Sequence, residues 1–124
     1  MSRSIAIAAF ALVAASGVAR AEDAQAFFKD RQLRFIIATA AGGDYDLWGR
    51  AITRHMGNHL WNATFVVQNM PGAGGINAAN HLFNVAPKDG STIGMIGRNL
   101  PNQAVLKLPT VKFDPARFNW IGSP

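Results

Sequence analysis

Residues 33–56, LRFIIATAAGGDYDLWGRAITRHM, decide the fold of this chain. Residues 33–39 are mainly apolar and β-branched, which is typical of a strand buried on both faces of a sheet. The glycine-containing loop at residues 40–43 follows, and residues 44–56 then carry apolar side chains at helical spacing. A charge-poor strand, a glycine loop and a helix in this order indicate the first half of a βαβ unit.

The helix expected at residues 44–56 has recognisable ends and one apolar stripe. Asp44 and Asp46 stand at its N-terminus, where carboxylates cap free N–H groups and oppose the helix dipole. Gly57 is expected to follow it as the C′ residue. The expected stripe consists of Trp48, Ala51, Ile52, His55 and Met56.

The same pattern then repeats along the chain. A second strand is expected at residues 64–68, a second glycine loop at 71–75 and a second helix at 76–83, with Ile76, Ala79, Leu82 and Phe83 as its apolar face. A third charge-poor strand is expected at residues 92–96. The sequence therefore predicts an α/β fold with a parallel βαβαβ sheet and right-handed crossovers.

The pattern is weaker after Pro101. We expect a short helix at residues 102–106, an extended segment at 108–113 and the start of another strand at 120–122. Three strands with two helices leave part of a parallel sheet uncovered. Residues 22–124 are therefore interpreted as one domain that is incompletely closed.

The first 21 residues have the layout of a secretory signal peptide. Arg3 supplies a positive charge, residues 5–15 are apolar, and Ala19-Arg20-Ala21 offers small residues for cleavage before Glu22. The apolar run is too short for the roughly 20 residues that span a bilayer. The chain is therefore expected to be exported, and the localisation predicted from the signal is the periplasm.

Composition excludes several classes of protein. The 124 residues carry a formal net charge of +5, and removal of Arg3 and Arg20 with the signal would leave +3. The remaining basic residues form no cluster, so nucleic acid is not an expected partner. There is no cysteine, so the exported chain would depend on an ordinary packed core and not on disulfides.

Three loops are expected at the carboxyl ends of the strands, where open α/β sheets bind ligands. They cover residues 39–45, 69–75 and 97–102, and each contains glycine, which lets backbone N–H groups approach a ligand. The loop at 40–43 leads into a helix N-terminus, which attracts anions, although its glycines would also serve a plain tight turn. Arg98 would either make a bidentate contact with an anionic ligand or lie in solvent at the surface. The glycines at 71–75 are interpreted as structural.

Other chemistries have little support in the sequence. His55 and His59 have the spacing of helical zinc ligands, but Gly57 lies between them, and neither the glutamate of HExxH nor a third ligand is present. There is no GxGxxG, no GxxxxGK[ST] and no GxSxG. We therefore expect no metal, no cofactor and no enzymatic activity, and an enzyme acting on a phosphorylated substrate is the weakest alternative.

At this point the residues resemble a known family. The stretch AAGGDYDLWGR, residues 40–50, is similar to the GGxxDxxAR motif that follows the first strand in tripartite tricarboxylate transporter receptors, the Bug family. Gly42, Gly43, Asp46 and Arg50 stand at the matching positions, and Gly49 replaces the usual alanine. The stretches VVQNMPGAGGINAAN, residues 66–80, and APKDGSTIG, residues 86–94, resemble the second and third blocks of the family.

The resemblance implies a two-lobed periplasmic binding protein of type II, of which residues 22–124 are part of the first lobe. Such a receptor traps a small organic acid between its lobes and delivers it to the membrane permease subunits of the transporter, working as a monomer when complete. Asp46 would chiefly hold the loop and helix start in shape. The ligand-binding residues that the resemblance and the sheet topology suggest are Ala40, Ala41, Gly42, Gly43, Asp46, Gly97, Arg98 and Asn99.

Family members are about three times longer, so the 124-residue chain is expected to be an N-terminal portion that binds its solute weakly or not at all. Citrate-like acids, C4 dicarboxylates, aromatic acids and uncharged solutes all remain open as ligands. The alternatives are an exported interaction module that meets a partner through an uncovered sheet edge, and the remnant of a truncated gene.

Overall fold

The structure is a computed structural model that describes residues 19–123. The apolar core of the expected signal peptide, residues 5–15, lies outside the described residues. The first described element is helix α2, Ala19–Phe28, which leads into the sheet. No helix within residues 19–123 is long and apolar enough to cross a membrane.

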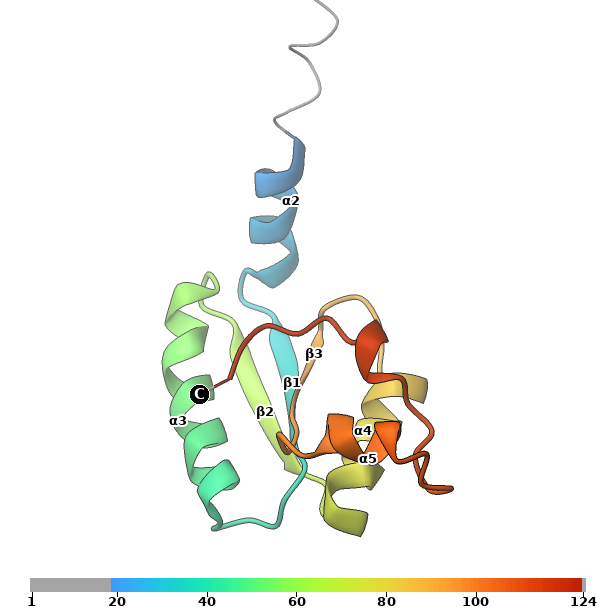
Figure 1. Cartoon of the computed structure of the whole chain (residues 1–124). Coiled ribbons are helices and arrows are strands. Elements are labelled where there is room, and N and C mark those ends of the chain that lie inside the picture. Colours follow the sequence, from blue (N-terminus) through green and yellow to red (C-terminus); the bar gives the residue numbers. More distant parts are fainter. Residues whose placement is uncertain (1–18, 124) are drawn as a thin grey trace, which may run out of the picture.

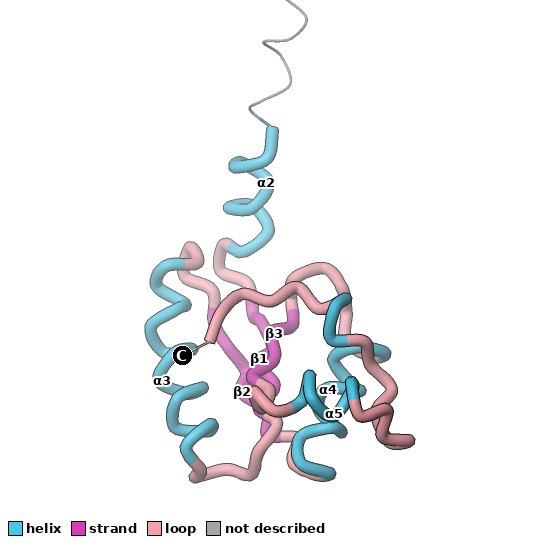
Figure 2. The backbone as a smooth tube through the Cα atoms, in the orientation of Figure 1, coloured by secondary structure: helices cyan, strands magenta, loops and turns pink. Residues whose placement is uncertain are grey.

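Three parallel strands form the sheet (Figures 1 and 2). Strand β1, Gln32–Ile37, lies in the centre, with β2, Thr64–Asn69, on one side and β3, Thr92–Met95, on the other. The α/β fold class with a parallel βαβαβ arrangement is thus confirmed, and the strand bounds differ from the expected ones by at most two residues. β1 is central because its residues are apolar enough to be buried on both faces.

The two long helices cover opposite faces of this sheet. Phe35 and Ile37 of β1 point to the face covered by α3, Asp44–His59, where Tyr45 and Met56 pack against them. Ile36 and the following Ala38 point to the face covered by α4, Ile76–Asn84, whose apolar face is the expected one with Ala78 added. Figure 1 shows α3 and α4 on either side of the strands. Alternation along one strand therefore builds both layers of the core.

The expected apolar stripe of α3 is wrong. Trp48 is 60% exposed, whereas the helix buries Asp46, Gly49, Thr53 and Gly57. The reason is close packing, because a Cβ on Gly49 would lie 2.6 Å from Cδ1 of Ile37. The small residues let the helix approach the sheet and Trp48 is turned outward, although Met56, another member of the expected stripe, does pack against Phe35 and Ile37.

Gly57 is also not the C′ residue of α3. The helix continues to His59, and Gly57 lies in its last turns, where a Cβ would stand 2.4 Å from the carbonyl oxygen of Ala63. Glycine is present here because the chain that returns toward β2 passes directly against the helix backbone.

The segment after β3 contains two short helices. Helix α5, Leu100–Val105, begins two residues before the expected helix, with Pro101 at its first turn, and the 3₁₀ helix η2 follows at Pro115–Arg117. Leu100 and Phe113 are buried against Ile76 and Ala79 of α4. The strand expected at residues 120–122 does not form. Instead the indole N–H of Trp120 donates a 2.8 Å hydrogen bond to the carbonyl of Pro115.

Candidate functional site

A hollow of about 350 Å³ lies at the carboxyl ends of the three strands. In the strand order β2-β1-β3, the chain moves from β1 to β2 on one side and then to β3 on the other side of β1. The direction of strand addition therefore reverses at the carboxyl ends of β1 and β3, which is where open α/β sheets bind ligands. The residues that line the hollow come from the loops after all three strands: Ala38, Thr39, Ala40, Tyr45, Pro71, Gly72, Gly74, Gly75, Gly97 and Asn99.

Three of the eight predicted site residues line this hollow: Ala40, Gly97 and Asn99. The others lie beside it. Arg98 is exposed on the loop after β3, and Ala41, Gly42 and Gly43 form the exposed turn before α3. Asp46 is buried in α3, with 3% of its surface exposed, behind that turn. The hollow lies at the end of the sheet where the three loops were expected, but less of the first loop lines it than expected.

The glycine loop at residues 71–75 was interpreted as structural, yet it forms one wall of the hollow. Gly72, Gly74 and Gly75 line it and have φ angles of 127°, 62° and 94°, which favour glycine strongly over any other residue. A Cβ on Gly75 would stand in ordinary contact with Leu100 and Ala38, at 3.4 Å, so the positive φ and not the lack of space favours glycine at this position. The loop therefore shapes the hollow.

Thr39 and Tyr45 are lining residues that the sequence analysis did not single out. Thr39 lies two residues after the end of the central strand, and its buried hydroxyl has no hydrogen-bond partner within residues 19–123. Tyr45 belongs to the first turn of α3. Thr39 stands at the end of a predicted strand and Tyr45 at the start of a predicted helix, and these positions alone could have marked them as site residues in the sequence.

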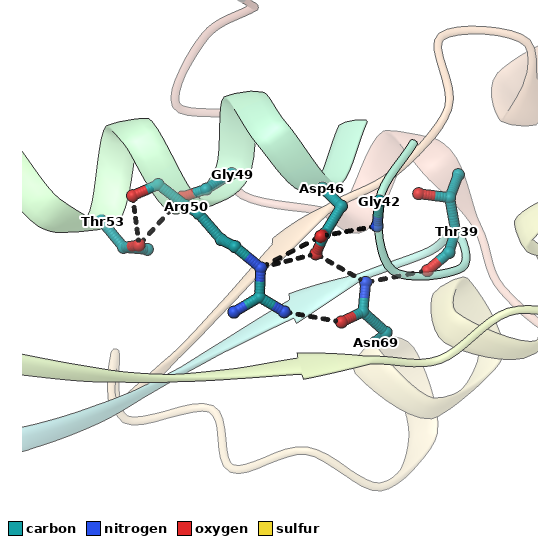
Figure 3. Close-up of polar contacts among 7 residues, drawn as sticks. All are labelled: Thr39, Gly42, Asp46, Gly49, Arg50, Thr53 and Asn69. Atoms are coloured by element: carbon teal, nitrogen blue, oxygen red, sulfur yellow. Dashed lines mark hydrogen bonds and ion pairs between the residues drawn. The ribbon is translucent and has the colours of Figure 1, made fainter. Parts of the chain in front are cut away.

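Behind the first loop, Asp46 is the centre of a polar network (Figure 3). The backbone N–H of Gly42 donates to its Oδ2 at 2.8 Å, and Nε of Arg50 donates to both carboxylate oxygens at 3.0 Å. Nδ2 of Asn69 donates to Asp46 Oδ1 at 2.9 Å and to the carbonyl of Thr39 at 3.0 Å. One carboxylate therefore fixes the turn at Gly42 to the start of α3.

Asn69 extends this network to the second strand. It is the last residue of β2, and its Oδ1 accepts a 3.1 Å hydrogen bond from Nη2 of Arg50. The side chains of Arg50 and Asn69, from different elements, thus hold each other as well as Asp46. The network keeps the ends of β1 and β2 and the start of α3 in a fixed arrangement, which positions two walls of the hollow.

The pKa of Asp46 is lowered from 3.8 to about 2, first by the hydrogen bond from Arg50 and then by those from Gly42 and Asn69. Because the folded pKa lies below the ordinary value, the ionised carboxylate stabilises the fold fully above pH 3.8. This contribution disappears as the pH falls toward 2.

We expect Asp46→Asn to lower the thermal unfolding temperature clearly at pH 6, because an amide cannot accept all of these hydrogen bonds. The decrease in unfolding temperature should be smaller at pH 3, because the ionised carboxylate of Asp46 then stabilises the parent chain less. Thermal unfolding at both pH values measures it, with Asp44→Asn as the control, since Asp44 is exposed and its side chain makes no hydrogen bond in the described structure. An equal loss at both pH values would contradict this role of the charge.

No side chain caps the N-terminus of α3 or that of α4. Their N-cap residues are Gly43 and Gly75, and neither helix has a capping hydrogen bond from a side chain at its N-cap. Capping of α3 by Asp44 and Asp46 was therefore a wrong expectation, because Asp46 instead accepts from Gly42. Both helices begin at the carboxyl end of the sheet, where their N–H groups and positive dipole ends favour an anion.

The lining of the hollow contains no charged side chain. Tyr45 offers a hydroxyl and Asn99 an amide, and the other lining residues contribute backbone groups, whereas the hydroxyl of Thr39 is buried. Such a lining provides hydrogen bonds and helix dipoles to an anionic group without a full countercharge. It also lacks an acid–base pair, so the arrangement is suited to holding a ligand.

Residues 19–123 contain no group of three or more potential metal-ligating side chains. His55 and His59 do share helix α3, because the helix continues past Gly57. The expectation that Gly57 separates the two histidines was therefore wrong.

Comparisons with known proteins give no family for this chain. No family model matches it. No curated protein matches it either.

Proposed function

We propose that this chain is the solute-binding component of a tripartite tricarboxylate-type transporter and that its hollow receives a carboxylate of a small organic acid. The observation that carries the proposal is the hollow at the strand-order reversal, lined by three glycine-containing loops and flanked by two helix N-termini without side-chain caps. Backbone N–H groups and dipoles at such a place favour a carboxylate.

The residues that carry the family resemblance support this proposal. Gly42, Asp46 and Arg50 stand at motif positions and belong to one hydrogen-bonded network, and Gly43 is the N-cap of α3. These motif residues are separated in the sequence but meet around one loop. Such an arrangement is expected of residues that stabilise the conformation of the loop. The network explains why a loop that contacts ligand through its backbone would need specific side chains behind it.

The wider proposal follows the same family. The described residues would form part of the first lobe of a type II periplasmic binding protein, exported to the periplasm and working with membrane permease subunits. The hollow is open to solvent on its outer side. A second lobe would supply the remaining contacts and exclude water, so the described lobe alone is expected to bind weakly.

Asn99 is the most direct side chain to test. It lines the hollow, and a hydrogen bond to a charged group is worth about 1.5–3 kcal/mol, so Asn99→Ala should weaken carboxylate binding about tenfold or more. Asn102→Ala is the matched control, because Asn102 is exposed about one turn away and does not line the hollow.

Affinities for citrate and succinate would be measured by NMR titration, which detects millimolar binding. We expect Asn99→Ala to lower the affinity for both acids about tenfold or more, and Asn102→Ala to change it by less than about twofold. Equal effects of the two substitutions would place the ligand elsewhere.

A further inference from the structure

A second hollow, of about 430 Å³, lies between α3 and β2. It shares no lining residue with the hollow at the carboxyl ends. Arg50, Arg54 and Asn58 line it from the helix, and Phe65 and Val67 line it from the strand. β2 is an outer strand of the three-stranded sheet, and Figure 1 shows it beside α3. The second hollow is therefore next to an open sheet edge.

The backbone of β2 offers hydrogen bonds at this edge. The N–H of Thr64 donates to Arg31 and the N–H of Met70 donates to Ile37, so the even-numbered residues between them face β1. Because strand residues alternate, the N–H and C=O groups of Phe65 and Val67 point away from β1. The edge is not blunted in the usual ways, since the strand TFVVQN contains no charged residue and no proline.

The helix side of the second hollow carries a matching row of side chains. Arg50, Arg54 and Asn58 are four residues apart on α3, which places them about 6 Å from one another along the helix axis. Alternate side chains of a strand are about 6.7 Å apart. In a strand added beside β2, the side chains that point toward α3 would therefore have nearly the same spacing as Arg50, Arg54 and Asn58, and each could meet one of them.

We propose that the β2 edge binds an extended segment of a partner protein in which acidic and apolar residues alternate. The lining of the second hollow includes two arginines and no carboxylate, and Arg54 makes no ion pair within the described part of the chain. Acidic side chains on the α3 face would meet Arg54, as opposite charges at an interface commonly do, whereas Arg50 is already paired with Asp46. Apolar side chains on the opposite face would cover Val66, which is 46% exposed.

A second copy of this chain fits the edge less well. In an antiparallel pairing of two β2 strands, a twofold axis normal to the sheet leaves both α3 helices on the same face. Each copy would then bring Arg50 and Arg54 toward those of the other, and like charges at an interface oppose association. The free arginine at the edge therefore selects an acidic occupant.

The experiment uses the isotope-labelled chain and the acetylated, amidated peptide EVEVEVE, with KVKVKVK as the charge-reversed control. Binding of the acidic peptide should shift the amide signals of Phe65 and Val67 and slow their hydrogen exchange, because both N–H groups gain partners. Arg54→Glu should weaken binding about tenfold or more. Arg117→Glu makes the same change of charge on the exposed 3₁₀ helix η2, which lines neither hollow, and should leave the affinity within about twofold.

Val67→Pro gives a second test that does not depend on charge. Proline is tolerated on an edge strand where its missing N–H would have faced solvent, so the sheet should persist while peptide pairing is lost. Equal binding of the basic peptide would overturn the proposal, as would equal effects of the two arginine variants. Signal changes confined to β3 or to residues 39–43 would also overturn it. Protection of Phe65 and Val67 in concentrated chain without peptide would instead identify a second copy as the occupant.

Discussion

Leu100→Ala should remove about 2–5 kcal/mol of the free energy of unfolding. Leu100 is fully buried where α5 meets α4, in contact with Ile76, Ala79 and Phe113. Truncation leaves a cavity between two helices that the neighbouring side chains cannot fill completely. Because domains of this size are stable by about 5–15 kcal/mol, the loss is a large part of the total.

Urea denaturation followed by circular dichroism measures this loss. Leu106→Ala is the matched control, because Leu106 directly follows the same short helix and is 71% exposed. Its substitution should change stability by less than about 0.5 kcal/mol. Similar losses for the two variants would mean that α5 is not packed on α4 as described.

The consequence of Leu100→Ala should extend to the hollow. Leu100 lies directly beneath Gly75, and Asn99 precedes it in the chain. Loosening α5 would therefore disturb two of the three lining loops at once. The core cluster around Leu100 also contains Ile76 at the start of α4 and Ile96, which follows β3.

Gly57→Ala is expected to destabilise the chain by about 1–3 kcal/mol, although alanine normally stabilises a helix by about 1 kcal/mol relative to glycine. The new methyl group would stand 2.4 Å from the carbonyl oxygen of Ala63, which belongs to the backbone and cannot rotate away. The clash therefore outweighs the helix propensity, and the connection between α3 and β2 has to shift.

Thermal or urea unfolding decides between these two opposing effects. Asn58→Ala serves as the control in the same turn, because Asn58 is exposed and the substitution changes mainly helix propensity. It should be neutral or slightly stabilising. A Gly57→Ala chain more stable than the parent would show that α3 does not approach Ala63 as closely as described.

Strands and loops were the predictable part of this fold. The run from Leu33 to Thr39 identified a central buried strand because only a strand covered on both faces uses consecutive apolar residues. Glycine runs marked the turns that connect the strands to the helices. The strands and turns were predictable because they depend on local chemistry and chain direction alone.

The buried face of α3 was not predictable in the same way. Hydrophobic periodicity assumes that large side chains fill the space between helix and sheet, but here Gly49 and Gly57 bring the backbone itself into contact. Trp48 is then left outside. Such close approaches depend on the partner surface, which periodicity along one segment does not contain.

The hydrogen bonds of Asn69 were likewise beyond sequence reasoning. Its role depends on meeting Asp46 and Arg50 across 23 and 19 residues of chain. The motif GGxxDxxAR contains its partners but not Asn69 itself. Only the parallel pairing of β1 with β2, in the register that places Asn69 opposite Ile37, brings it to the loop.

An NMR titration of the isotope-labelled chain with citrate and succinate, followed residue by residue, tests whether the hollow at the carboxyl ends of the strands receives an organic carboxylate. We expect saturable shifts concentrated in the amides of residues 39–45, 72–76 and 97–100, and no comparable change at Phe65 or Val67. No shift at millimolar carboxylate, or shifts centred away from these three loops, would contradict the proposal.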